Sequence, residues 1–167
     1  MAITIRNAIR EDISQIYAFI HELAEYENMP PDTVCVTEAN LERDGFGESP
    51  YFRCLIAEHN DRPAGFALYY FNYSTFSGKP GLYIEDLFVV PELRRNGIGK
   101  ALLARVAANA VKLGSRRLQW EVLDWNLPSM EFYQSLGAEF VDEWRNMRIT
   151  DGAVEKLAMT DRAGSTR

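Results

Sequence analysis

Hydrophobic and polar positions alternate with two different periods along this chain, and the two periods predict its strands and helices. Residues 83–90 form an apolar run rich in β-branched and aromatic side chains, interrupted by Glu85 and Asp86 and ended by Pro91, which is typical of a buried strand. Beyond the following turn, apolar residues recur at helical spacing up to Gly114, which has the position of a C-terminal cap. A strand, a turn and an amphipathic helix therefore form the predicted centre of the fold.

Shorter elements on both sides of this centre complete the pattern. A helix capped by Asp12 runs to about Glu27, Thr37 caps a second helix, and a further short helix starts near Pro128. The other predicted strands are residues 3–6, 52–58, 64–73, 118–123, 140–144 and 145–149. We expect a single-domain α/β fold, with a mixed, mostly antiparallel, twisted sheet of about seven strands flanked by about four helices. The domain should span residues 1–159, and residues 160–167 should form a disordered polar tail.

The turn before the central helix has the features of an anion site. Gly97 and Gly99 allow a ligand to approach the backbone closely, and the first N–H groups of a helix have no partner within the helix. Arg94 and Arg95 lie just before the turn, and Lys100 lies just inside the helix. Together these features predict a bound phosphate or pyrophosphate. A tight turn with solvated arginines is the alternative.

Other glycine-rich nucleotide motifs do not fit this turn. A dinucleotide fingerprint that begins at Gly97 would need glycine or alanine where Leu102 stands. A Walker-type loop that ends in the G-K pair at 99–100 would need serine or threonine where Ala101 stands. The spacing R-x-x-G-x-G at residues 94–99 instead resembles the acyl-CoA-binding turn of the GNAT family of N-acetyltransferases.

Composition and charge narrow the class of protein further. With 167 residues, 47% of them hydrophobic, the chain is long enough to bury a core of its own. Its net charge of −6 argues against nucleic acid as the main ligand and suits a cationic substrate. No apolar run reaches membrane-spanning length and no signal sequence precedes the first strand pattern, so we expect a cytoplasmic protein that does not bind membranes.

The cysteine and histidine residues do not suggest a metal site. Neither Cys35 nor Cys54 has the spacing to His21 or His59 that metal ligands show. We interpret both cysteines as free thiols and both histidines as structural, and we expect no metal.

Longer segments extend the resemblance over nearly the whole chain, from Ile5 to about Ala158. They are Y-I-E-D-L-F-V-V-P-E-L-R-R-N-G-I-G, V-L-D-W-N-L-P-S-M-E-F-Y and Y-Y-F-N-Y-S-T-F-S-G. They are similar to the diamine acetyltransferase branch of the GNAT family, which includes spermidine/spermine and thialysine acetyltransferases. The resemblance implies the GNAT fold, acetyl-CoA as co-substrate, direct acetyl transfer to an amine through a ternary complex, and a homodimer.

The resemblance also implies where acetyl-CoA would bind. Its pantetheine would lie between the central strand and the strand at 118–123. The implied contact residues are Phe88, Val90, Arg94, Arg95, Asn96, Gly97, Ile98, Gly99, Lys100, Asn126 and Ser129. Asn126 also has the position of a plain helix cap, and the two roles are compatible.

Two residues match catalytic positions of the family. An alkyl ammonium group has a pKa of about 10.4 and must lose a proton before it can attack, so a base is needed at neutral pH. Glu85 matches that base, acting directly or through water, and a carboxylate on a buried strand favours a functional role. Tyr133 matches the acid that protonates the thiolate; its alternative role is to fill the core. A strand bulge should expose a backbone N–H near Leu87 or Phe88 to the developing negative charge.

Four residues match positions that line the family's acceptor pocket: Glu27, Phe76, Asp86 and Trp144. Carboxylates and aromatic faces both attract alkyl ammonium groups. Ser74 and Phe76 stand where the polyamine enzymes carry an acidic residue and a tryptophan. We therefore expect a shorter acceptor, such as thialysine, a lysine-like compound or a diamine.

Two other functions stay open. A protein lysine or N-terminal acetyltransferase would need an open peptide groove, which no sequence feature marks. A non-catalytic acyl-CoA-binding sensor would need the turn at 94–99 but neither Glu85 nor Tyr133. The presence of both side chains favours catalysis.

Overall fold

The computed structural model describes residues 2–115 and 117–161, which form two compact units, one up to Trp125 and one from Asn126 onwards. The helices of the first unit are α1 (Ile13–Tyr26), α2 (Glu38–Phe46) and α3 (Ile98–Lys112). Its strands are β1 (Ile3–Asn7), β2 (Arg53–His59), β3 (Arg62–Ser74), β4 (Lys79–Val89) and β5 (Leu118–Gln119). The second unit holds α4 (Leu127–Ser135) and α5 (Gly152–Ala158). From residue 162 onwards the predicted polar tail lies outside the described residues, and a single domain over residues 1–159 stays a prediction.

The five strands form one mixed sheet whose order follows the chain, β1-β2-β3-β4-β5. The first four are antiparallel neighbours, and β5 adds parallel to β4 after the crossover through α3. This confirms the α/β class and the mainly antiparallel sheet. β2 and β3 are joined by a short turn, in which Asn60 and Asp61 have φ values of 51° and 60° that suit a tight hairpin.

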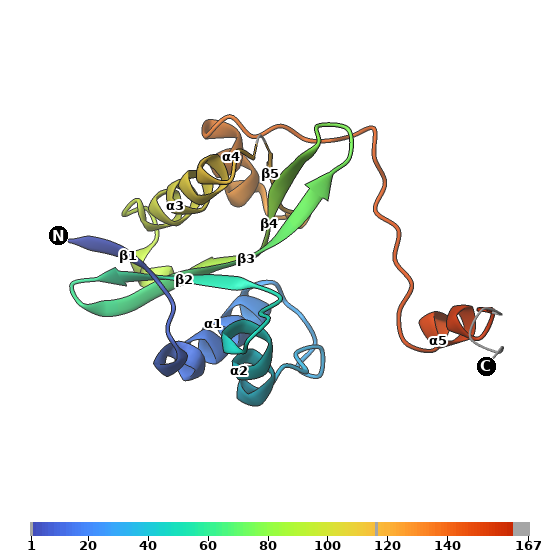
Figure 1. Ribbon diagram of the computed structural model, residues 1–167. Coiled ribbons are helices and arrows are strands. Elements are labelled where there is room, and N and C mark those ends of the chain that lie inside the picture. Colours follow the sequence, from blue (N-terminus) through green and yellow to red (C-terminus); the bar gives the residue numbers. More distant parts are fainter. Residues whose placement is uncertain (1, 116, 162–167) are drawn as a thin grey trace. The chain divides into compact units, whose positions relative to one another are not determined.

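Helices cover both faces of this sheet (Figure 1). α1 and α2 lie on one face and α3 lies on the other. Side chains alternate accordingly, because Cys54 and Ile56 of β2 join the core cluster under α1, while Leu55 between them is buried on the opposite face. Phe19 of α1 stacks on Phe66 of β3 with ring centroids 5.7 Å apart. Full burial of such a side chain contributes about 1.5–3 kcal/mol, so this contact helps to hold α1 on the sheet.

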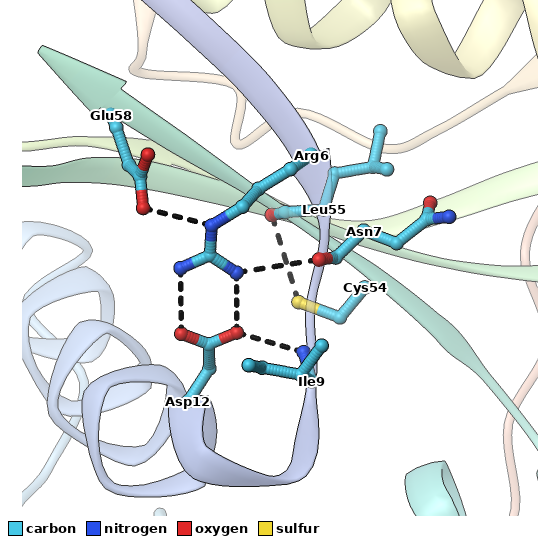
Figure 2. Close-up of polar contacts among 7 residues, drawn as sticks. All are labelled: Arg6, Asn7, Ile9, Asp12, Cys54, Leu55 and Glu58. Carbon is cyan, nitrogen blue, oxygen red and sulfur yellow. Dashed lines mark hydrogen bonds and ion pairs between the residues drawn. The ribbon is translucent and has the colours of Figure 1, made fainter. Parts of the chain in front are cut away.

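A charged network joins the start of α1 to the edge of the sheet (Figure 2). The guanidinium group of Arg6 on β1 donates two bonds to Asp12, at 2.6 and 2.8 Å, and one to Glu58 on β2, at 2.8 Å. Hydrogen bonding to Arg6 lowers the pKa of Asp12. Asp12 precedes α1, as predicted, but its carboxylate does not cap that helix; it accepts from Arg6 and from the Ile9 N–H at 2.8 Å instead.

The count of about seven strands is wrong, since the described residues contain five. Residues 140–144 and 145–149 form no strand, and β5 is shorter than the predicted 118–123. Of the apolar side chains in this stretch, Trp144 is 74% exposed and Met147 is 92% exposed. A strand needs a neighbour for its backbone hydrogen bonds and a layer to cover its apolar face, and a sequence pattern shows propensity without showing the partner.

The starts of α2 and α4 have the predicted capping residues. The Asn40 N–H donates to Thr37 Oγ1 at 3.1 Å before α2, and the Ser129 N–H donates to Asn126 Oδ1 at 3.4 Å at the start of α4. α5 is not predicted from the sequence, so the described residues contain five α-helices rather than about four. It has seven residues and no buried side chain, so it lacks the periodic apolar face that reveals a helix.

Candidate active site

The central strand β4 departs from regular pairing at Glu85. Leu68 of β3 lies opposite Asp86, while the next residue of β3, Tyr69, lies opposite Ile84. Glu85 is therefore an extra residue of β4, as in a β-bulge. A bulge is present in this strand, as expected, but its extra residue is Glu85 rather than a residue at Leu87 or Phe88.

Asp86 belongs to the face of the sheet that α1 covers. Leu68, opposite Asp86, and Phe88, two residues further along β4, belong to the core cluster under α1. Glu85 is exposed to water, whereas Asp86 is only partly exposed. Burial, followed by the negative charges of Glu85 and of Glu27 at the end of α1, raises the pKa of Asp86 to about 7. Burial also raises the pKa of Glu27.

The far edge of β4 is open along much of its length. β5 pairs only with Leu82 and Tyr83. In the part of the chain that the structure describes, no strand pairs with Ile84–Val89 on that side. An open edge presents unpaired N–H and C=O groups, and an extended ligand that carries amides can bind there as an added strand.

Backbone directions along β4 decide which residues face this edge. The Val90 N–H donates to a carbonyl of β3 at 3.0 Å, and the Phe88 carbonyl lies 2.3 Å from where a Cβ on Gly65 would stand. Both groups thus face β3. Because backbone directions alternate in antiparallel pairs, those of Leu87 and Val89 face the open edge. Leu87 is one of the two residues named above for an exposed N–H, whereas Val89 is missed by the sequence-based prediction, since only the strand register reveals it.

The turn after β4 has the geometry of an anion site. Gly97 has a φ of +83°, in the left-handed region that favours glycine. The first intrahelical bond of α3 runs from the Ala101 N–H to the Gly97 carbonyl at 3.0 Å, which leaves the N–H groups of residues 98–100 without an acceptor in the helix. The first turn of α3 carries no acidic residue, and Arg95 and Lys100 are exposed beside it. Such a helix start suits a phosphate.

Arg94 links this turn to the end of α1. Its Nε donates to the Val89 carbonyl at 3.0 Å, and its guanidinium lies 4.3 Å from the centroid of the Tyr26 ring. The Val89 carbonyl at the open edge is therefore already occupied. Arg94 holds the turn against the sheet as well as adding positive charge to it.

Phe76 lies apart from the other predicted acceptor residues of the first unit. It is 96% exposed, in the turn that joins β3 to β4. β4 begins at Lys79, and a strand rises about 3.3 Å per residue, so Asp86 lies roughly 20 Å further along. Within one chain the structure brings Glu27, Glu85 and Asp86 together without Phe76.

The remaining predicted site residues belong to the second unit. Tyr133 on α4 is partly buried, with its ring centroid 5.3 Å from that of Phe132. Asn126 and Ser129 form the start of the same helix, and Trp144 is an exposed residue of the chain beyond it. One short helix therefore presents three of the predicted residues.

Cysteines and metal ligands add no further site in the described residues. Cys35 and Cys54 are free, as predicted. No group of three His, Cys, Asp or Glu side chains in residues 2–115 and 117–161 is arranged to hold a metal ion. No helix in these ranges has the length and apolar character to cross a membrane.

Together, the fold and the site define a class of protein. A bulged central strand with an open edge leads directly into an anion-binding helix start. The open edge suits the amides of an acyl-CoA-type ligand, and the helix start suits its pyrophosphate. The chain belongs to the acetyltransferase (GNAT) family, whose model matches residues 10–138. The expected resemblance is thereby confirmed.

Relatives place the chain within the diamine acetyltransferase branch. It is 40% identical over 167 residues to the thialysine N-epsilon-acetyltransferase of Bos taurus, covering 93% of this chain and 97% of that protein. It is 41% identical over 141 residues to the human spermidine/spermine N(1)-acetyltransferase-like protein 1, covering 80% of this chain and 20% of that protein.

Solved structures share the fold. An integron cassette protein from the mobile metagenome of V. cholerae matches with a TM-score of 0.79 and 25% identity, covering 96% of this chain and 99% of the other. An aminoglycoside acetyltransferase from a soil metagenomic sample matches with a TM-score of 0.73 and 21% identity, covering 89% of this chain and 95% of the other. The second likeness concerns the fold alone.

Proposed function

We propose that the protein transfers the acetyl group of acetyl-CoA to a primary amine of a small cationic substrate, by direct attack through a ternary complex. One observation carries this proposal: Glu85 and Asp86, with Glu27 at the end of α1 close to Asp86, lie on the same strand that leads into the anion-binding turn. A group of carboxylates that suits a cation thus lies next to backbone groups that suit the cofactor. Relatives that span most of the chain are named thialysine N-epsilon-acetyltransferases, which supports an amine acceptor.

The residues present fit acetyl-CoA, which when bound would supply a thioester-linked acetyl group. The N–H groups of residues 98–100, with Arg95 and Lys100, suit its pyrophosphate. The backbone groups of Leu87 and the Val89 N–H at the open edge suit the pantetheine amides, so we propose these contacts in place of those predicted at Phe88 and Val90. The other proposed contacts are Arg94, Asn96, Gly97, Asn126 and Ser129.

The proposed proton transfers use groups of the chain itself. A carboxylate of the β4 bulge, which the family likeness assigns to Glu85, takes a proton from the substrate ammonium group. The Leu87 N–H at the open edge donates to the negative charge that develops on the thioester oxygen. The family likeness assigns to the Tyr133 hydroxyl the donation of a proton to the departing sulfur. No metal enters this scheme.

Replacing Tyr133 with phenylalanine is expected to lower kcat about 100-fold, because a general acid contributes at least that much. Acetyl-CoA affinity should stay nearly the same, since the ring and its contact with Phe132 remain. Thiol release measures kcat, and calorimetry measures affinity. Tyr73→Phe, which removes a hydroxyl from a residue that is 62% exposed, is the matched control. An unchanged kcat in Tyr133→Phe would remove the hydroxyl from the acid role.

The acceptor is proposed to be short, such as thialysine, a lysine-like amine or a diamine. The decisive experiment measures acetyl-CoA turnover against thialysine, putrescine, spermidine, lysine and a basic peptide. Preference for thialysine or a diamine supports the interpretation of Ser74, whereas preference for spermidine contradicts it. A peptide preference would favour a protein acetyltransferase. Cofactor binding without any turnover would favour an acyl-CoA sensor.

We also propose a homodimer. The chain at 140–149 exposes Phe140, Trp144 and Met147 to solvent, and a partner that covered them would remove this apolar area from water. The separation of Phe76 from Asp86 within one chain fits a site completed by a second copy. Sedimentation at micromolar concentration should therefore show a dimer, and a single species of 19.1 kDa would contradict it. A cytoplasmic location, without nucleic acid or membrane as partner, stays a prediction.

A further inference from the structure

One aromatic ring joins the end of α1 to the turn that follows β4. Tyr26 is the last residue of α1, and the guanidinium group of Arg94 lies over its ring, 4.3 Å from the centroid. The ring of Trp125 is a second neighbour, with its centroid 6.2 Å from that of Tyr26. All three residues belong to the first compact unit. The Tyr26 ring is therefore in contact with the residue that opens the anion-binding turn.

Arg94 is oriented by the sheet but keeps donors for a ligand. Its Nε donates to the Val89 carbonyl at 3.0 Å, and its guanidinium lies 5.8 Å from the centroid of the buried Phe88 ring. Among residues 2–115 and 117–161, no carboxylate pairs with Arg94, and no hydrogen bond comes from its terminal nitrogens. A guanidinium has five N–H donors and can bind a phosphate through two of them. Arg94 can therefore contact an anion at the turn and the Tyr26 ring at the same time.

The end of α1 lacks a cation of its own. The last turn of this helix contains Glu25 and no basic residue, although the partial negative charge of a helix C-terminus favours a cation there. Arg94 brings a positive charge to this helix end from another segment. Glu27 follows Tyr26 directly and is close enough to Asp86 to contribute to its raised pKa. Restraint of the Tyr26 ring therefore also restrains Glu27, one of the predicted acceptor residues.

We propose that Tyr26 is a positioning residue whose ring couples cofactor binding at the turn to amine binding beside Glu27. The inference rests on the acetyl transfer proposed above and concerns how the two substrates influence each other. A phosphate held by Arg94 restrains the guanidinium, and this cation in turn restrains the Tyr26 ring and the end of α1. An amine that binds afterwards orders less of the chain and so binds more tightly. Because coupling is reciprocal, the amine strengthens cofactor binding by the same factor.

The test uses CoA, which has no acetyl group to transfer, together with thialysine and putrescine. Calorimetry measures the dissociation constant of each amine with and without CoA. In the wild type, CoA should tighten amine binding about five-fold. Tyr26→Leu, which removes the ring, should reduce this factor to about one, whereas Tyr26→Phe, which keeps the ring, should retain it. Tyr51→Leu, at a tyrosine that is 79% exposed, is the matched control and should behave as the wild type does.

A second variant tests whether the coupling runs through Arg94. Arg94→Lys keeps the charge but loses the planar group that stacks on the ring, so it should also lose the coupling. Adding Tyr26→Leu to it should change the coupling factor no further. In steady-state turnover, Tyr26→Leu should raise KM for both substrates by about the same factor, with kcat changed less than about three-fold. Circular dichroism checks that each variant is folded.

Three results would overturn the inference. The first is a wild type that binds the amines equally well with and without CoA. The second is a Tyr26→Leu variant that keeps the wild-type coupling factor, even if its amine binding is weaker, since the ring would then contact the amine directly. The third is an equal loss of coupling in Tyr26→Phe, which would assign the effect to the hydroxyl group. A wild type that binds CoA but neither amine would overturn the proposed function as well.

Discussion

Replacing Gly65 with alanine is expected to lower the free energy of unfolding by about 3 kcal/mol and to weaken acetyl-CoA binding. A Cβ at this position would lie 2.3 Å from the Phe88 carbonyl oxygen and 3.0 Å from Val89 Cα. Both are backbone atoms of β4, so no side-chain rotation relieves the overlap. β3 and β4 must move apart where they touch.

The strand that moves is the one proposed to hold the cofactor. Thermal unfolding should therefore shift downward by about 6–12 °C, and calorimetry should show an acetyl-CoA affinity about ten-fold weaker, equivalent to roughly 1.4 kcal/mol. Gly152→Ala is the matched control, because a Cβ there meets no atom within 4 Å. A Gly65→Ala protein as stable as the control would contradict the close backbone contact.

Replacing Arg6 with alanine is expected to have the other large effect, a loss of about 2 kcal/mol of stability. The guanidinium group is the shared partner of Asp12 and Glu58, whose side chains are only 12% and 22% exposed. Its removal leaves two poorly hydrated carboxylates facing each other without a cation. Both the edge of the sheet and the start of α1 lose their connection.

The effect of Arg6 should depend on pH in one direction. Arg6 lowers the pKa of Asp12 below its ordinary 3.8. A carboxylate with a lowered pKa adds stability that is complete above that value and lost as pH falls through the folded-state pKa. Urea unfolding should thus show a constant difference between wild type and Arg6→Ala at neutral pH and a shrinking one below about pH 4. Arg43→Ala, which breaks an exposed contact with Asp44, should leave the midpoint unchanged. A difference that grows in acid would contradict this account.

The centre of the fold can be predicted from sequence because its signals are local. Pro91 ends the strand region, Gly97 adopts the left-handed conformation that the turn requires, and Asn126 caps α4. Each of these depends on a few neighbouring residues. The same holds for the carboxylate pair at Glu85 and Asp86, whose presence on a mostly buried strand already indicates function.

Pairing between distant segments is harder to predict. The sequence around Glu85 is compatible with a regular strand as well as with a bulge. The bulge is recognised only from the strand pairing, in which Glu85 has no partner on β3 between the partners of Leu68 and Tyr69. The register likewise decides that Leu87, and not Phe88, faces the open edge. The residues from Phe140 onward show apolar alternation, but whether it becomes a strand depends on a neighbour that the sequence does not specify.

The order of the strands affects the entropy of assembling the site. β2, β3 and β4 follow one another along residues 53–89, joined by short turns. Closing such short loops costs less chain entropy than bringing β1 to β2 across α1 and α2, or β5 to β4 across α3. The bulge and its carboxylates lie within this continuous segment. The part of the molecule with the most demanding geometry is thus built from the contacts that are least costly for the unfolded chain to form.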